Sequence, residues 1–215
     1  NEGLKGVLLT DALVRLNSDT LQQIIQGLNL FTMCLDDMED PHPLSGTLAR
    51  FVDQILEKLA RDEGKLGAEY VTPSTLKSLC TALPRTDVET VYDGTCGIGG
   101  FLIEFARVIS DRHNRVPKLY GQEANHEVWS LARMNMILHG LYDAKIALGD
   151  TLERPSFAKN GNRLMTFDLV LMNPPFSLPW KGIEVVKRDP YNRFRFGIPH
   201  GSMADMAFVQ HAVAS

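Results

Sequence analysis

The chain has 215 residues, of which 44% are hydrophobic, and its 22 lysines and arginines are outnumbered by 26 aspartates and glutamates, so the net charge is −4. This balance excludes a protein with a generally basic surface, and any contact with nucleic acid is therefore expected to be local or shared with a partner. No apolar run approaches the roughly 20 residues of a membrane-spanning helix, no signal peptide is recognisable, and three scattered cysteines suit neither a disulfide framework nor a four-ligand zinc site. We expect a cytoplasmic protein with reduced thiols, no metal site and no membrane contact.

The first part of the chain has a helical pattern. Residues 4–65 contain no run typical of a strand, and one apolar stripe is formed by Leu48, Phe51, Val52, Ile55 and Leu59. An acidic, proline-containing stretch at residues 36–43 indicates a loop between two helical segments. We predict a small N-terminal helical domain over residues 1–66.

Beyond Gly67, short apolar or β-branched runs alternate with longer helical patterns, which is typical of a parallel sheet with crossover helices. The predicted strands are residues 90–93, 118–123, 144–150 and 167–173, and the predicted helices are residues 100–111 and 126–139, the latter stopped by Gly140. The first three strands end in polar or acidic residues and the fourth ends in Asn-Pro-Pro. Ligands of open α/β sheets bind at this carboxyl edge, so we predict an α/β catalytic domain over residues 67–215.

A glycine-rich segment from Asp93 to Phe101 follows the first strand and opens the next helix. Its glycines would let a ligand approach the backbone at the helix start, although a tight strand-to-helix turn without a ligand has the same pattern. The dinucleotide-binding fingerprint fails, because counting from Gly97 places Leu102 where its last glycine belongs. Asp93 suits a ligand with a cationic amino acid moiety better than a pyrophosphate, which a carboxylate repels.

Acidic residues also end the second and third predicted strands. Glu123 is placed to accept hydrogen bonds from two ribose hydroxyls of a nucleoside, and Asp150 to accept one from an adenine amino group while Leu152 covers the ring. Each acid taken alone is more typical of a helix cap or a solvated turn than of a ligand contact. Three acids on three successive strand ends favour a shared site.

The most specific motif is Asn173-Pro174-Pro175-Phe176, directly after the fourth predicted strand. An exocyclic amine is a poor nucleophile because its lone pair is delocalised. Two fixed acceptors, the Asn173 side-chain oxygen and the Pro174 carbonyl, would take its two hydrogens and aim the lone pair at a sulfonium methyl group. Phe176 would stack on a base swung out of the duplex. The alternative is a strand terminator with Phe176 in the core.

With these residues, the chain resembles the modification (methyltransferase) subunit of type I restriction-modification systems, of the N6-adenine DNA methyltransferase family. The resemblance covers about residues 48–215 and follows the order and spacing of its motifs. These motifs are Gly67 to Pro73, the glycine turn, Gly121 to Glu123, Asn135 with His139 and Gly140, Gly149 to Leu152, Asn173 to Phe176, Gly197 to Pro199 and Ala204 to Phe208.

The resemblance implies a Rossmann-like fold that binds S-adenosylmethionine, transfer of its methyl group to adenine N6 in DNA, and a complex with a specificity subunit and a restriction subunit. The catalytic residues would be Asn173, Pro174, Pro175 and Phe176. The predicted cofactor-binding residues are Glu69, Tyr70, Val71, Thr72, Pro73, Ser74, Asp93, Gly97, Ile98, Gly99, Gly100, Phe101, Glu123, Asp150, Leu152 and Asn173.

The chain departs from the family pattern in two places. Gly94 stands where the family usually has proline, and we expect it to loosen the turn and lower cofactor affinity. The chain also stops one helix after the catalytic motif, so we expect a fragment without the later strands of the sheet. Chemistry leaves three alternatives open: N4 methylation of cytosine, N5 methylation of a protein glutamine, and a scaffold that does not catalyse.

One further segment, residues 187–196, alternates cations with aromatic rings. It would either line a DNA channel, where arginine meets phosphate and rings meet bases, or form a solvated loop with its rings packed into the domain.

Overall fold

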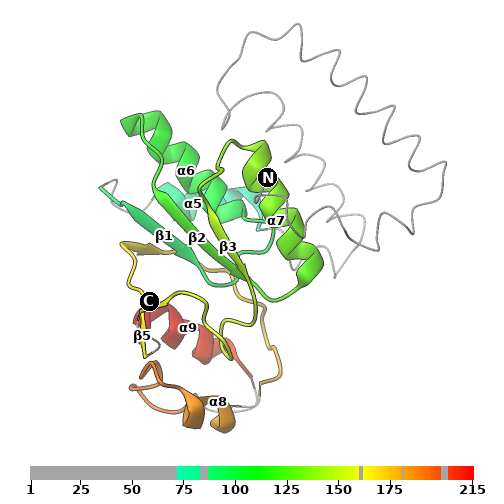
Figure 1. Ribbon diagram of the computed structural model, residues 1–215, viewed down its shortest axis with the longest axis vertical. Helices are drawn as coiled ribbons and strands as arrows, with labels where there is room; N and C mark the ends of the chain where they lie inside the picture. Colours follow the sequence, from blue (N-terminus) through cyan, green and yellow to red (C-terminus); the bar gives the residue numbers. More distant parts are fainter. Residues whose placement is uncertain (1–71, 83–86, 160–161, 181, 200–202) are drawn as a thin grey trace, which may run out of the picture.

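The computed structural model describes residues 72–82, 87–159, 162–180, 182–199 and 203–215 (Figure 1). The helical domain predicted over residues 1–66, with its boundary at residue 67, lies outside these residues. Within the described ranges, no helix is long and apolar enough to cross a membrane.

The centre of the domain is a four-stranded sheet in the order β3-β2-β1-β6, and all of its pairs are parallel. Its strands are β1 (Thr90–Asp93), β2 (Lys118–Glu123), β3 (Lys145–Leu148) and β6 (Leu169–Val170). The prediction of an α/β domain with a parallel sheet is confirmed, and β1 and β2 begin and end at the expected residues.

β6 is shorter than the predicted strand over residues 167–173, for reasons at both of its ends. Before the strand, one carboxylate oxygen of Asp168 accepts hydrogen bonds from the amides of Glu89 and Thr90 and from the Thr90 hydroxyl, in place of ladder bonds. These bonds lower the pKa of Asp168. After the strand, the Leu171 amide still donates to the Tyr92 carbonyl, but β1 ends at Asp93, so residues 172–173 have no strand beside them to pair with.

Three helices lie on one side of the sheet: α5 (Ser74–Ala82), α6 (Gly100–His113) and α7 (His126–Leu138). The two predicted helices end within two residues of the expected positions. Asn125 caps α7 by accepting from the amides of Glu127 and Val128, and Gly140, with a φ of 71°, ends it as predicted. Beneath α6 lies the main core, which includes Val91, Leu102, Phe105, Ile109, Leu119 and Met136.

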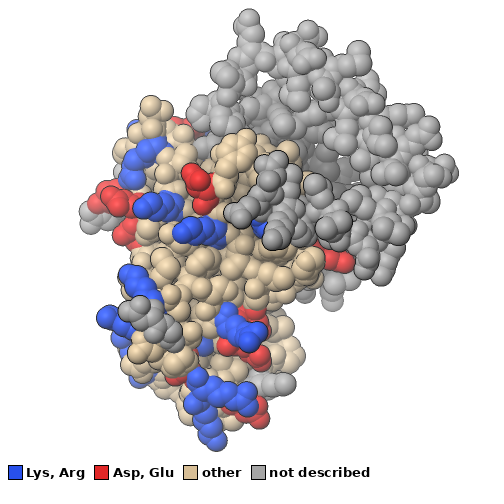
Figure 2. All heavy atoms as spheres, viewed as in Figure 1, with Lys and Arg blue, Asp and Glu red and all other residues tan. Residues whose placement is uncertain are grey.

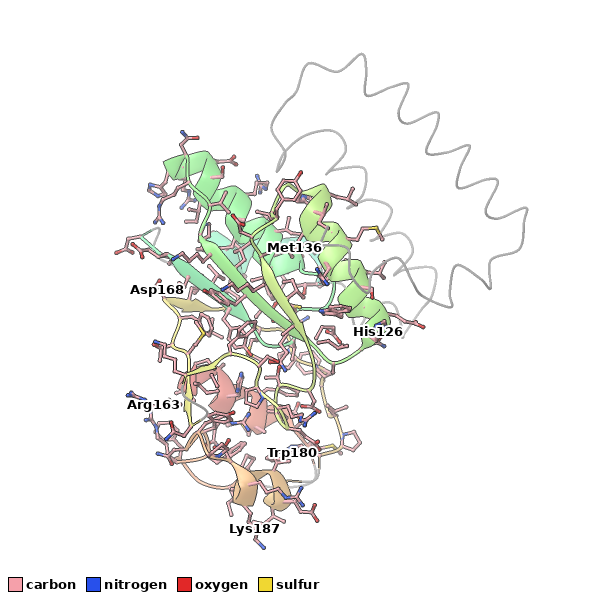
Figure 3. The ribbon with its side chains drawn as sticks, in the orientation of Figure 1. His126, Met136, Arg163, Asp168, Trp180 and Lys187 are labelled. Carbon is pink, nitrogen blue, oxygen red and sulfur yellow. The ribbon has the colours of Figure 1, made fainter. Side chains whose placement is uncertain are left out.

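The other side of the sheet is covered by aromatic rings and by the C-terminal segment. Tyr92 and Tyr120, neighbours in the β1–β2 register, pack against Phe157 and Phe167. The segment contains α8 (Ile183–Arg188) and α9 (Asp205–Ala214), with Trp180 and Lys187 in its lower part (Figures 1 and 3). A hairpin, β4 (Ala158–Lys159) with β5 (Arg163–Leu164), which the sequence analysis does not predict, joins this side.

We expect Leu102→Ala to lower the free energy of unfolding by about 2–5 kcal/mol, because Leu102 is fully buried beneath the sheet and its removal leaves a cavity. Leu131→Ala, on an α7 side chain that is 40% exposed, is the matched control and should cost less than about 1 kcal/mol. Chemical denaturation of both variants measures the difference. Equal losses would contradict the assignment of the core.

Candidate functional site

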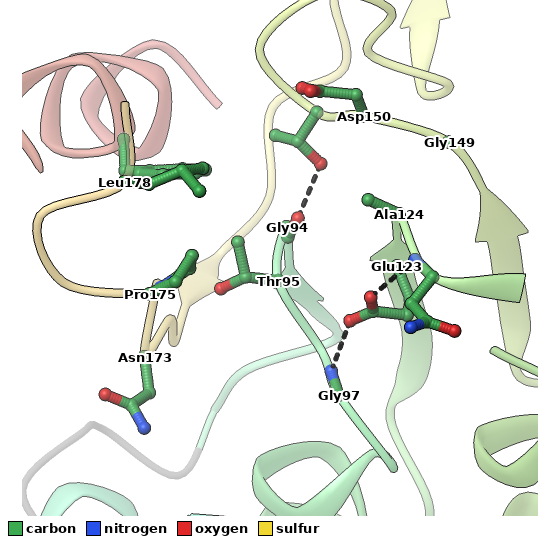
Figure 4. Close-up of a pocket in the computed structure, with 13 residues that line it drawn as sticks. Gly94, Thr95, Gly97, Glu123, Ala124, Gly149, Asp150, Asn173, Pro175 and Leu178 are labelled. Carbon is green, nitrogen blue, oxygen red and sulfur yellow. Dashed lines mark hydrogen bonds between the residues drawn. The ribbon is translucent and has the colours of Figure 1, made fainter. Parts of the chain in front are cut away.

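A cavity with a volume of about 230 Å³ opens at the carboxyl edge of the sheet (Figure 4). Loops after all four strands and helix α9 form its wall. The lining residues are Gly94, Thr95, Gly97, Glu123, Ala124, Asn125, Gly149, Asp150, Thr151, Asn173, Pro175, Leu178 and Phe208.

The glycine turn forms the middle of the cavity wall. Gly97 and Gly99 have φ angles of 53° and 87°, which side chains disfavour. A Cβ atom at Gly99 would also lie 2.1 Å from the terminal methyl of Met136, so a side chain here would require that methyl group to move. Gly99 therefore serves the packing behind the turn and does not line the cavity.

Glu123 ties the glycine turn to the end of β2. One carboxylate oxygen accepts from the Gly97 amide at 3.1 Å and the other from the Asn125 amide at 2.8 Å (Figure 4). Burial raises the pKa of Glu123, against the effect of these bonds. The Ala124 amide also acts on this carboxylate, which has about four acceptor positions and so keeps capacity for a ligand hydroxyl in the cavity.

Asp150 lies on another part of the wall, after β3 (Figure 4). Its Oδ1 accepts from the amides of Leu152 and Glu153 at 2.8 and 3.1 Å, which closes a turn and leaves Oδ2 for a ligand. The Thr151 hydroxyl donates to the Gly94 carbonyl and so ties this turn to the glycine turn.

Asn173 and Pro175 line the wall next to the glycine turn (Figure 4). Phe176 is 82% exposed, which excludes the alternative that it is a core residue. The loop after it is held to the start of α9, since the Ser177 amide donates to Asp205 Oδ1 and the Ala204 amide donates to the Leu178 carbonyl. The motif and the glycine turn thus share one cavity.

The structure does not bring all predicted site residues to the wall. Leu152 packs in a hydrophobic core with Phe194 and Phe208, and Phe101 is buried on α6. Ile98 and Asp93 are also buried. Gly100, Thr72, Pro73 and Pro174 are described but do not line the cavity. Glu69, Tyr70 and Val71 lie outside the described residues, as does the side chain of Ser74.

Several wall residues were not among the predicted site residues: Gly94, Thr95, Ala124, Asn125, Gly149, Thr151, Leu178 and Phe208. Most of them are next to predicted residues on the same loops. Because these loops follow predicted strands, the sequence could have indicated that these residues line the cavity. Phe208 belongs to α9. In the sequence, only its place in the motif of residues 204–208 indicates that it could belong to the site.

Gly94, where the sequence predicts a looser turn, lies among close neighbours. Its carbonyl accepts from Thr151, and a Cβ atom at this position would lie 2.9 Å from the Tyr92 hydroxyl and 3.0 Å from the Met172 methyl. The missing side chain is what lets these groups close around the turn.

For residues 187–196, the sequence left two alternatives, a DNA-contacting segment and a loop packed into the domain, and different residues agree with each. Arg193 and Phe194 are buried, as expected of a loop packed into the domain. Arg188, Arg195 and Phe196 are exposed, as a nucleic-acid contact would need.

Asp93 is 2% exposed, and its Oδ1 accepts from the Thr95 amide at 3.0 Å. Burial first, and then the charge of Glu123, raise the pKa of Asp93 from 3.8 to about 7. The folded chain therefore keeps a proton that the unfolded chain releases above about pH 4. The resulting stabilisation is complete below about pH 4 and is lost as the pH rises towards 7.

We expect Asp93→Asn to remove this pH-dependent loss of stability. The free energy of unfolding of the variant, relative to the unchanged chain, should rise between about pH 4 and 7 by roughly 1–4 kcal/mol, because each unit of pKa corresponds to about 1.4 kcal/mol. Thermal denaturation across this pH range measures the difference. Parallel pH profiles for the two proteins would contradict the assignment.

Comparisons with known proteins agree with this geometry. The profile of the N-6 DNA methylase family matches residues 45–215. The methylase subunit of the type I restriction enzyme MpnII of Mycoplasma pneumoniae is 31% identical over 211 residues, an alignment that covers 92% of this chain and 38% of that protein.

Two solved structures show the same fold. The type I restriction-modification methyltransferase subunit from Streptococcus thermophilus superposes with a TM-score of 0.57 at 33% identity, covering 68% of this chain and 31% of that one. A class I S-adenosylmethionine-dependent methyltransferase from Listeria monocytogenes, described as putative, has a TM-score of 0.60 at 15% identity, covering 82% of this chain and 52% of that one.

The fold is thus the Rossmann-like fold of S-adenosylmethionine-dependent methyltransferases. The chain spans less than half the length of the Mycoplasma and Streptococcus proteins that it matches. Since the family profile covers most of its residues, the chain belongs to the N-6 DNA methylase family.

Proposed function

We propose that the protein containing this chain transfers a methyl group from S-adenosylmethionine to adenine N6 in DNA, as the modification subunit of a type I restriction-modification complex. One observation carries the proposal. Asn173, one of the two proposed acceptors for the amine, lines the same cavity as Glu123 and Asp150, the proposed acceptors for a nucleoside. We also propose that residues 67–215 form the catalytic domain and residues 1–66 a helical one.

The residues of the cavity fit S-adenosylmethionine. Glu123 would accept from the ribose hydroxyls, and the free Oδ2 of Asp150 from the adenine amino group. The Gly97 region lets the backbone approach the ligand closely. The sulfonium of S-adenosylmethionine supplies an electrophilic methyl group and leaves as a neutral thioether.

Asn173 and the Pro174 carbonyl would hold the target amine. Their two oxygens accept its two hydrogens, so that its lone pair points along the line of attack on the methyl carbon. In such an arrangement an N–C bond would form as the S–C bond of the donor breaks, and the methylated amine would release one proton to water. Phe176, with its exposed ring, would stack on the extruded base.

Membership in the N-6 DNA methylase family favours adenine N6 over cytosine N4 and over a protein glutamine. A scaffold without cofactor binding is disfavoured, because the carboxylates that would hold the cofactor face an open cavity. DNA contact would be local. On the face shown in Figure 2, lysine and arginine side chains are dispersed among acidic ones. Proposed partners, a specificity subunit and a restriction subunit, would supply most phosphate contacts.

In the complete protein, we expect Asn173→Ala to lower methyl transfer by at least about a hundredfold, because one of the two acceptors that orient the amine is lost. Binding of S-adenosylmethionine should change by less than about threefold, since the ribose and adenine acceptors stay in place. Single-turnover methylation and calorimetry measure the two effects. Asn162→Ala, on an exposed side chain, is the control, and retained transfer by Asn173→Ala would reject the role.

We expect Glu123→Gln to weaken S-adenosylmethionine binding to this chain by about tenfold or more, because the charged acceptor of the ribose hydroxyls is lost. The side-chain NH2 group of the glutamine would also face the backbone amide of Gly97 or of Asn125, so that two donors would oppose each other. Glu127→Gln, at an exposed position in the first turn of α7, is the matched control and should bind as the unchanged chain does. Calorimetric titration compares the three, and equal affinities would contradict this site.

A further inference from the structure

The side chain of Arg193 is almost completely buried in the segment between α8 and α9. Its exposed fraction is 2%, and that of its partner Asp189 is 3%. The Arg193 Nε donates to Asp189 Oδ1 at 2.7 Å, and the Arg193 amide donates to Asp189 Oδ2 at 2.8 Å. A buried ion pair of this kind is costly to desolvate, and replacing it by apolar residues often gives equal stability. Stability alone therefore gives no reason for a guanidinium group at this place.

The two terminal nitrogens of Arg193 reach the turn that forms one wall of the cavity. Nη1 donates to the Thr151 carbonyl at 3.0 Å and Nη2 to the Leu152 carbonyl at 2.6 Å. Thr151 and Leu152 are 3% and 1% exposed, so water does not reach these carbonyls and each needs a donor from the protein. The planar fork of the guanidinium group serves both at once, which a lysine cannot do.

The same turn is built on Asp150. Asp150 Oδ1 accepts from the amides of Leu152 and Glu153, while the carbonyl of Leu152 accepts from Arg193. The Thr151 hydroxyl donates to the Gly94 carbonyl on the opposite side. The direction in which the free oxygen of Asp150 points is therefore set by bonds to neighbouring residues, and Arg193 makes two of them.

His211 of α9 extends the connection to the sheet. Arg193 Nη1 lies 3.4 Å from His211 Nδ1, and His211 Nε2 lies 3.0 Å from the Tyr92 hydroxyl. Burial, and secondly the charge of Arg193, lower the pKa of His211 to about 3, so the ring is neutral. Since arginine only donates, Nδ1 is the acceptor, and Nε2 carries the proton and donates to Tyr92.

We propose that Arg193 is a positioning residue for the cofactor: it holds the carbonyls of Thr151 and Leu152 so that the carboxylate of Asp150 points into the cavity. This inference rests on the proposed function, because it assigns to Asp150 the adenine end of S-adenosylmethionine. It makes cofactor affinity depend on a residue that does not line the cavity and that belongs to the segment after the Asn173 motif.

The test is a double-mutant cycle on this chain, read by calorimetry with S-adenosylmethionine and S-adenosylhomocysteine. Arg193→Lys keeps the charge opposite Asp189 but loses the fork, and we expect about tenfold weaker binding. Asp150→Asn keeps the oxygen that closes the turn and replaces the free acceptor. In the Asp150→Asn background, Arg193→Lys should weaken binding by less than about threefold, because the oxygen that Arg193 positions is already absent.

Additivity separates positioning from a general loss of structure. In the Glu123→Gln background, the full effect of Arg193→Lys should remain, since the ribose acceptor belongs to another loop. Arg195→Lys, exposed in the same segment, should bind as the unchanged chain does. Unchanged affinity of Arg193→Lys, or equal effects in all backgrounds, would overturn the inference.

Two further outcomes are distinguishable. If Arg193→Lys does not fold, Asp189→Asn tests the same step, because it frees the guanidinium while leaving the turn intact. A loss of affinity that disappears with Asp150→Asn supports the inference, and unchanged affinity overturns it. If the unchanged chain binds neither ligand, it is the proposed function that fails, together with everything that rests on it.

Discussion

The cavity depends on one constraint: buried backbone groups at the carboxyl ends of the strands must find hydrogen-bond partners, and side chains from neighbouring elements supply them. Glu123 serves the amides of Gly97 and Asn125, and Thr151 serves the carbonyl of Gly94. Gln122, which is fully buried, donates to the carbonyls of Gly149 and Arg154 and accepts from the amide of Ser156. Each loop is thus held by the loop beside it, and the cavity is the space that they leave open.

These bonds also explain how polar side chains can shape a loop and still bind a ligand. A carboxylate has more acceptor positions than one or two amides occupy, so Glu123 and Asp150 keep capacity towards the cavity. Burial raises the pKa of Glu123, and the amides that it accepts from act in the opposite direction. Asp93 has one such backbone bond and lies deeper, which leaves its pKa near 7. Of these carboxylates, Asp93 fits a role inside the turn better than a contact with a charged ligand.

Sequence alone predicted the sheet well, because buried parallel strands are short apolar runs and their ends are marked by polar residues, as at Asp93 and Glu123. It also placed Asn173 and Glu123 at one site, since parallel strands end at one edge. It could not tell which neighbours face the cavity, and Leu152, expected to cover a ring, instead packs against Phe194 and Phe208. The packing of Leu152 depends on α9, which lies more than fifty residues further along the chain. No pattern in the sequence around Leu152 indicates this contact.

The two halves of the cavity wall come from different parts of the chain, and this has a mechanical consequence. The acceptors proposed for the cofactor precede residue 151, whereas the wall that carries Asn173 continues through Leu178 to Phe208 of α9. Asp205 and Ala204 hold the loop after Phe176, while Arg193 and His211 reach back to Thr151 and Tyr92. A shift of α9 would therefore move the amine acceptors and the adenine end of the cofactor site together. Because packed cores respond as units, α9 and its buried contacts would, under the proposed function, couple the Asn173 side of the cavity to the Asp150 side.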